Sequence, residues 1–305
     1  MDTSTVIAVF CYKRKQKLKI AMEALLKNPE CASMEVIFFS DGYKNDQDKQ
    51  GVLETREYID SITNFKSVRK EFREKNLSTG PNFELGLTYL CNNYDQFIVV
   101  EDDVVVTSNY IKYLLDALLY YKEQKSVFCI TGFCFPLNKG LYEYDSLVYN
   151  RFSSNGWASW SDRVKGVVWN KYELSKLMET SPGFKKRLNK EGHDLYRMLK
   201  KQIVGKISTW DIQMQVHVAE NQLNVIYPVV SKTNNIGFDN ESTNTFGINF
   251  LKTPQDDGNK REFNFCDSQT ISLSLQEQLR RPYRFWILVR RKIINTMIKH
   301  LILRR

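Results

Sequence analysis

Short apolar runs rich in β-branched and aromatic residues alternate with amphipathic stretches through the first 135 residues. The run STVIAVFCY at 4–12 is followed by KRKQKLKIAMEALLKN at 13–28, whose apolar side chains fall on one helical face. Further apolar runs, separated by helical stretches, lie at 34–40, 65–72, 96–106 and 126–133. This alternation predicts an α/β fold with an open, mostly parallel sheet and helices on both faces.

The pattern becomes less regular after residue 135, with a loop and then a helical region at roughly 170–200. We expect one domain over 1–250, with halves at 1–135 and 136–250. A polar linker over 251–279 then leads to a separate C-terminal segment over 280–305.

The net charge of +9 belongs entirely to this C-terminal segment. From Arg280 onward there are nine Lys and Arg residues and no acid, which leaves 35 basic residues against 35 acidic ones in 1–279. On a helical wheel the basic side chains gather on one side and apolar ones, including Phe285 and Trp286, on the other. A basic amphipathic helix predicts binding to an anionic membrane surface. The alternatives are packing on the domain, a dimer contact and, last because the body is neutral, nucleic acid.

The six cysteines form no CxxC pair, and the three histidines form no zinc-type cluster. We therefore expect reduced thiols in a cytosolic protein. No stretch reaches the ~18 apolar residues of a membrane span, and the first apolar run is expected to be a strand rather than a signal peptide. Together with the basic segment, these features predict a cytoplasmic protein that is peripheral on the inner face of the cell membrane.

Three consecutive acids, Glu101, Asp102 and Asp103, interrupt the apolar run at 96–106. In an open α/β sheet, ligands bind outside the carboxyl ends of the strands, which is where these acids are expected. Clustered carboxylates suit a hard cation such as Mn²⁺ or Mg²⁺. Because side chains alternate along a strand, Glu101 and Asp103 share a face and Asp102 points away. The alternative is a solvated acidic turn.

Polar residues follow two other predicted strands at the same edge. Asp41 follows the second strand, where it can accept hydrogen bonds from a nucleobase or a ribose, or form a plain Asp-Gly turn. Lys13 and Arg14 follow the first strand, where they can bind phosphate or lie in solvent.

The order of these motifs resembles the GT-A-fold glycosyltransferases. The motifs are a Lys/Arg pair after strand one, SDG at 40–42, EDD at 101–103, GWASW at 156–160, TWD at 209–211 and NIGF at 235–238. The likeness covers about residues 5–248. It is strongest to bacterial enzymes of surface-polysaccharide assembly and extends distantly to N-acetylglucosaminyltransferase I.

This resemblance implies a GT-A fold whose first half, 1–135, binds a nucleotide-sugar and whose second half, 136–250, carries acceptor and catalytic residues. Asp103 would bind Mn²⁺ (or Mg²⁺) directly, and Glu101 and Asp102 would serve the ribose or metal-bound water. Asp41 would contact the base and ribose. Lys13 stands where the family often has an arginine, which leaves its role and that of Arg14 in doubt.

The resemblance also assigns residues of the second half. Asp211 would be the catalytic base, where the alternative from the residues alone is a helix N-cap. Trp157 and Trp160 would wall the sugar site, whereas Trp169 is expected in the core. The matched loop positions over the nucleotide or sugar are Asn235, Gly237 and Phe238.

We therefore expect a metal-dependent, inverting hexosyl- or N-acetylhexosaminyltransferase. It would move a sugar from a nucleotide-diphosphate donor, with UDP inferred from Asp41 and the resemblance, to a saccharide or lipid-linked acceptor. Two alternatives stay open. One is a nucleotidyltransferase, although FCYKRKQKLK lacks the glycine-rich phosphate loop of that class. The other is a catalytically inactive protein that binds a glycan or nucleotide.

Overall fold

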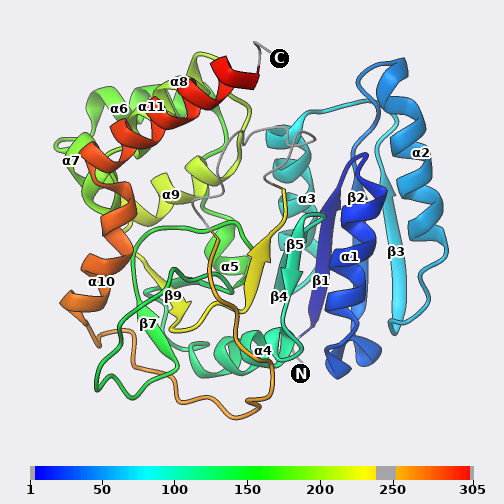
Figure 1. Ribbon diagram of the computed structural model, residues 1–305, viewed down its shortest axis with the longest axis horizontal. Coiled ribbons are helices and arrows are strands. Elements are labelled where there is room, and N and C mark those ends of the chain that lie inside the picture. The colour runs from blue at the N-terminus through cyan, green and yellow to red at the C-terminus, as the bar shows by residue number, and fades with distance from the viewer. Residues whose placement is uncertain (1–3, 238–251, 303–305) are drawn as a thin grey trace.

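The computed structural model describes residues 4–237 and 252–302, with side chains described as far as residue 297. An eight-stranded sheet, in the order β3-β2-β1-β4-β8-β6-β9-β7, forms its centre (Figure 1). The strands are β1 (Thr5–Cys11), β2 (Glu35–Ser40), β3 (Ser67–Phe72), β4 (Gln96–Glu101), β6 (Val127–Thr131), β7 (Ser146–Val148), β8 (Trp157–Trp160) and β9 (Asn224–Pro228).

The sheet is mostly parallel in its first half and mixed in its second. β1 pairs in parallel with β2 and β4, and β2 with β3. β8 runs antiparallel between β4 and β6, and β7 runs antiparallel to β9, which is itself parallel to β6. A separate antiparallel ribbon joins β5 (Val104–Val106) to β10 (Thr233–Asn235). The predicted α/β class is confirmed, and the antiparallel strands come from the irregular part of the sequence.

Helices cover both faces of the sheet because side chains alternate along each strand. Val36 and Phe38 of β2 belong to one hydrophobic cluster, whereas Ile37 and Phe39 belong to another. The first cluster packs against α1 (Lys15–Leu25), α2 (Asp46–Asp60) and α4 (Tyr110–Tyr120). The second packs against α3 (Thr79–Asn93), α9 (Asp211–Glu220) and α10 (Leu273–Arg280).

The expected helical region near 170–200 is a group of short helices with a small core of its own. It consists of α6 (Lys171–Thr180), α7 (Phe184–Leu188), the 3₁₀ turn η2 (Asn189–Glu191) and α8 (Leu195–Ile203). Leu174, Phe184 and Leu199 pack there against Ile212 and Val216 of α9. The remaining helical elements are η1 (Pro29–Ser33), α5 (Ser161–Val164), η3 (Arg281–Tyr283) and α11 (Phe285–Ile302).

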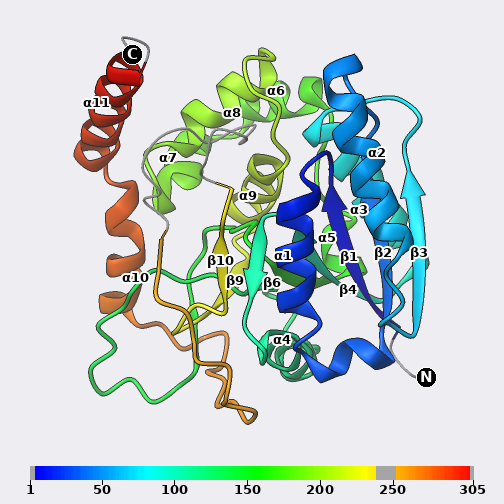
Figure 2. The ribbon, with the colours of Figure 1, turned by 45° about the vertical axis from the view of Figure 1, so that its right-hand side comes forward.

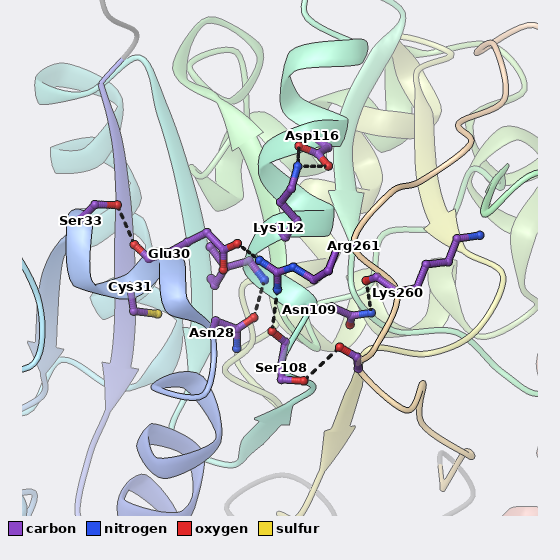
Figure 3. A network of polar contacts seen from close by, with 12 residues as sticks. Asn28, Glu30, Cys31, Ser33, Ser108, Asn109, Lys112, Asp116, Lys260 and Arg261 are labelled. Carbon is purple, nitrogen blue, oxygen red and sulfur yellow. Dashed lines mark hydrogen bonds and ion pairs between the residues drawn. The ribbon is translucent and has the colours of Figure 1, made fainter.

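Residues 252–272 have no regular structure but are fastened to the domain. Asn109 donates a hydrogen bond of 2.9 Å to the carbonyl of Lys260, and Arg261 donates one of 3.1 Å to the carbonyl of Ser108 and pairs with Glu30 (Figure 3). Cys266 is fully buried in the first cluster. This segment, expected as a linker, therefore contributes to the core.

The C-terminal helix α11 follows α10 and η3 at the periphery of the molecule (Figure 2). The predicted C-terminal helix is thus present. None of the helices in the described part of the chain is both long and apolar enough to cross a membrane.

Candidate functional site

The carboxyl ends of β1, β2 and β4 lie together at one edge of the sheet. Phe10 of β1 is in register with Glu101 of β4, and Cys11 of β1 with Ser40 of β2. Glu101 ends β4, and Asp102 and Asp103 form the turn that leads into β5. The residues that follow the three strands are therefore neighbours in space, as the sequence predicts.

Asp102 is buried and held by the segment that follows β1. The guanidinium of Arg14 binds both of its carboxylate oxygens, with Nε 3.3 Å from Oδ2, and the amide of Tyr12 donates to Oδ2 at 3.4 Å. Burial raises the pKa of Asp102, and the charge of Arg14 opposes this shift. Both oxygens of Asp102 are thus committed to the protein, so Asp102 is poorly placed to bind a metal or a ribose.

Asp103 is the point where three segments meet. Nη1 of Arg14 lies 2.9 Å from Oδ2 of Asp103, and the side-chain amide of Asn235 donates a hydrogen bond of 3.2 Å to Oδ1 of Asp103. The amide of Ile236 donates 2.8 Å to the Asp103 carbonyl, next to the β5–β10 ribbon. A Cβ atom on Gly237 would lie 2.1 Å from Oδ2, so a side chain there would displace the Asp103 carboxyl. Phe238, the last residue of the motif, lies outside the described residues.

Glu101 lies among charges of its own sign. Burial raises its pKa well above the ordinary value, Asp103 and Asp102 raise it further, Arg14 opposes them, and Asp211 adds a smaller upward effect. The last effect shows that Asp211 and Glu101 lie within electrostatic range of each other. The fold therefore brings the expected base and the expected metal ligands to one region.

Asp211 is the first residue of α9, and the N-cap of that helix is Trp210, so the N-cap alternative is wrong. The hydroxyl of Thr209 donates a hydrogen bond to the Asp211 carboxyl. Burial raises the pKa of Asp211, whereas this hydrogen bond and the charge of Arg151 lower it. A carboxylate with a raised pKa is a better proton acceptor than one in water.

Asp41 shapes the loop after β3. Its Oδ1 accepts hydrogen bonds of 2.9 Å from the amides of Gly42 and Leu77, and its Oδ2 accepts one of 3.0 Å from Asn76. Burial raises its pKa, and these backbone donors oppose the shift. Asp41 is therefore more than the Asp-Gly turn of the simpler interpretation, because it joins two loops at the site edge.

Lys13 and Arg14 diverge although they are adjacent in sequence. Lys13 forms an ion pair with Asp48 in the first turn of α2, and Tyr12 donates a hydrogen bond of 2.9 Å to the same carboxylate. Hydrogen bonding from Lys13 lowers the pKa of Asp48. Arg14 alone of the pair faces the acidic turn.

Trp157 and Trp160 are core residues, only 0% and 4% exposed. Trp157 packs edge-on against Phe152 at 5.2 Å and stacks near Trp210 at 5.9 Å, and the guanidinium of Arg163 lies 3.2 Å from the Trp160 ring centre. The expectation that Trp157 is not a core residue is wrong, because β8 inserts between β4 and β6 in the sheet. Neither ring offers a face to a sugar.

Two residues near the site had no assigned role in the sequence-based prediction. The side-chain amide of Asn235 donates a hydrogen bond of 3.1 Å to Oδ1 of Asn155, the residue that immediately precedes the GWASW segment. The hydroxyl of Thr209, the first residue of the TWD motif, donates a hydrogen bond to the Asp211 carboxyl. An Asn in a polar loop and a Thr before a helix are common, so no local signal distinguishes them.

The donor set fits a divalent cation that is shared with a substrate. Within residues 4–237 and 252–302, no three His, Cys, Asp or Glu side chains form a complete metal site. Mg²⁺-type ions, however, are usually bound by one or two carboxylates, with phosphates and water as the other ligands. Asp103 and Glu101 supply two such carboxylates.

No family model and no curated protein matches the chain. Among solved structures, S. aureus TarS matches with 15% identity and a TM-score of 0.35 over 53% of this chain and 29% of its own. S. aureus TarS 1–349 matches with 13% identity and a TM-score of 0.35, over 52% of this chain and 48% of its own. The mannosyltransferase PcManGT from Pyrobaculum calidifontis, in complex with GDP-Man and Mn²⁺, matches with 8% identity and a TM-score of 0.41. This match covers 72% of this chain and 70% of its own. The chain thus spans less than half the length of either TarS structure.

Proposed function

We propose that the protein is a metal-dependent glycosyltransferase that uses a nucleotide-diphosphate sugar. The observation that carries this proposal is the placement of Glu101 and Asp103 at the carboxyl edge of the parallel strands, with Asp211 close enough to contribute to the raised pKa of Glu101. Glu101 ends β4, Asp103 lies in the β4–β5 turn, and Asp211 begins a helix of the second half. Glycosyl transfer from such a donor needs both a site for the diphosphate and a separate proton acceptor.

Asp103 and Glu101 are the residues that would hold Mn²⁺ or Mg²⁺. The bound ion would neutralise the charge that develops on the departing diphosphate. Asn235 keeps the Asp103 carboxyl oriented, and Asp102 keeps Arg14 beside it. Burial, and after it repulsion from Asp103 and Asp102, raises the pKa of Glu101, and a cation at this position would relieve the repulsion.

Asp211 is proposed to remove the proton of the acceptor hydroxyl as this oxygen attacks the anomeric carbon. A single base opposite the leaving group leads to inversion at that carbon. Because burial raises its pKa, Asp211 accepts a proton more readily than an exposed aspartate does. Thr209 holds one of its oxygens and so limits its rotation.

The base and ribose of the donor are proposed to lie against Asp41. Asp41 lies just after β2 at the carboxyl edge, and its Oδ2 accepts a hydrogen bond from the side chain of Asn76. A carboxylate at this edge is an acceptor for the imide of a uracil or for a ribose hydroxyl, which supports a UDP-sugar. Arg14, which contacts Asp103, is proposed to lie on the diphosphate side of this edge, whereas Lys13 pairs with Asp48. Asn235 and Gly237 are proposed to face the sugar or the acceptor.

The acceptor is proposed to be a saccharide or a lipid-linked saccharide of surface-polysaccharide synthesis, reached from the inner face of the membrane. The support is α11, on which Phe285 and Trp286 are 54% and 77% exposed, and Met297 is also exposed. The segment from Arg280 onward carries nine basic residues and no acid. Exposed aromatic and basic side chains on one helix suit binding to an anionic lipid surface.

A turnover assay with separate UDP-, GDP-, dTDP- and CMP-sugars and Mn²⁺ tests the proposal. A glycosyltransferase releases the nucleotide from one donor, faster when acceptor is added, and EDTA stops the release. Release of pyrophosphate from a nucleoside triphosphate and a sugar phosphate would instead identify a nucleotidyltransferase. Binding of a donor without any release would identify an inactive binding protein.

A further inference from the structure

Arg14 makes contacts of unequal strength to two neighbouring carboxylates. It binds Asp102 in the bidentate manner that is the strongest geometry for an arginine and a carboxylate. It binds Asp103 through Nη1 alone, at 2.9 Å. The contact to Asp103 can therefore open while the pair with Asp102 stays intact.

The two carboxylates also differ in surroundings. The Asp102 side chain is 3% exposed and accepts a further hydrogen bond from the amide of Tyr12. The Asp103 side chain is 13% exposed and borders Gly237 and Asn235 of the opposite segment. Asp102 thus fixes the guanidinium in place, and Asp103 is the partner that faces the site.

Arg14 is the cation in direct contact with this acidic turn. A guanidinium stays charged at all physiological pH values. A second cation at Asp103 meets like-charge repulsion from a guanidinium that is already in contact with the same oxygen.

We propose that Arg14 is an internal counter-ion of Asp103, which a divalent metal displaces only together with the diphosphate of the donor. Asp103 would hold the metal, and Nη1 of Arg14, which contacts Oδ2 of Asp103 in its absence, would donate to a phosphate oxygen of the donor instead. The guanidinium stays held by Asp102 throughout. This inference rests on the proposed function, and it makes metal and nucleotide binding mutually dependent.

The consequence is a pair of opposite changes when Arg14 is removed. In Arg14→Gln, Mn²⁺ alone should bind about tenfold more tightly, because its competitor for Asp103 is gone. Binding of UDP in saturating Mn²⁺ should weaken about tenfold or more, because a phosphate contact is lost. A residue with only a structural role would not move the two affinities in opposite directions.

Both affinities are measured by calorimetry on the full chain, with Mn²⁺ alone and then with UDP in saturating Mn²⁺. Lys19→Gln is the matched control, since Lys19 lies on α1 and its partner Glu23 is itself exposed. This control should change neither affinity. Arg14→Lys keeps the positive charge but not the bidentate guanidinium, so it should change both affinities in the same directions by smaller factors. It also replaces Arg14→Gln if that variant does not fold.

Each outcome decides the inference. Tighter Mn²⁺ binding with weaker nucleotide binding supports it, whereas unchanged or weaker Mn²⁺ binding overturns it. If the wild-type protein binds no nucleotide with Mn²⁺, the proposed function fails. In that case the proposed contact between Arg14 and a phosphate fails as well. Whether Arg14 is the counter-ion of Asp103 is then decided separately, by the Mn²⁺ titrations of wild type and Arg14→Gln.

Discussion

The side-chain amide of Asn235 donates a hydrogen bond of 3.2 Å to the carboxyl of Asp103, across 132 positions of sequence. The contact exists because β10 pairs with β5, the strand that follows the acidic turn. Asn235 also donates to Asn155, so the turn, the loop before β8 and the segment after β10 meet at one place. The acidic turn is therefore held by tertiary contacts rather than solvated, since Asp102 and Asp103 are buried.

Asp211→Asn should retain binding of the donor and lose transfer. The amide preserves shape and the contact with Thr209 but cannot accept the acceptor's proton, so the rate should fall about 10²- to 10⁴-fold. The measurement is turnover of nucleotide-sugar with acceptor, alongside donor affinity by calorimetry. Full activity in this variant would remove Asp211 from the mechanism.

Thr209→Val should change the pH dependence of transfer. The Thr209 hydroxyl stabilises the charged carboxylate and so lowers the pKa of Asp211, which burial raises. Without it the pKa rises further, and a base is active only above its pKa. The acidic limb of kcat/KM should therefore move to higher pH. A limb that stays in place or moves to lower pH contradicts the assignment.

The sequence alone predicts the parallel half of the fold and the edge at which the site lies. Strands such as β1 and β4 carry local signals, and their carboxyl ends must meet wherever they pair in parallel. Trp157 was misplaced because its flanking Gly and Asn are polar-loop residues. Its burial follows from pairing of β8 with β4, which no local pattern encodes. Asn155 and Thr209 escaped prediction for the same reason, since only tertiary contacts distinguish them.

Trp157→Ala should destabilise the protein, whereas Trp286→Ala should not. Trp157 has no exposed surface and lies between Phe152 and Trp210, so its loss leaves a cavity that costs about 3–5 kcal/mol. Trp286 is 77% exposed, and its replacement should stay within about 0.5 kcal/mol. Denaturant unfolding of both variants checks this. Equal stabilities would contradict the placement of Trp157 in the core.

Removal of α11 should release the protein from anionic liposomes without unfolding it. The chain should end at Arg284, because Arg280 pairs with Glu191 and the ring of Tyr283 lies 3.5 Å from the guanidinium of Arg151. Co-sedimentation with anionic and with zwitterionic vesicles measures the effect, and Trp286→Ala should weaken binding in part. If the truncated chain binds anionic vesicles as well as the full chain does, the membrane surface lies elsewhere.

The most direct test of the proposed function is calorimetric titration with UDP, GDP, dTDP and CMP, in Mn²⁺ and then in EDTA. We expect one nucleotide, UDP, to bind in Mn²⁺ and to lose its affinity in EDTA. Asp103→Asn should lose at least about tenfold of that affinity, and Asp162→Asn, the same change in an exposed ion pair with Lys125, should lose none. Binding that is indifferent to EDTA and to Asp103→Asn, or no binding to the folded protein, would contradict a metal–nucleotide site at the acidic turn.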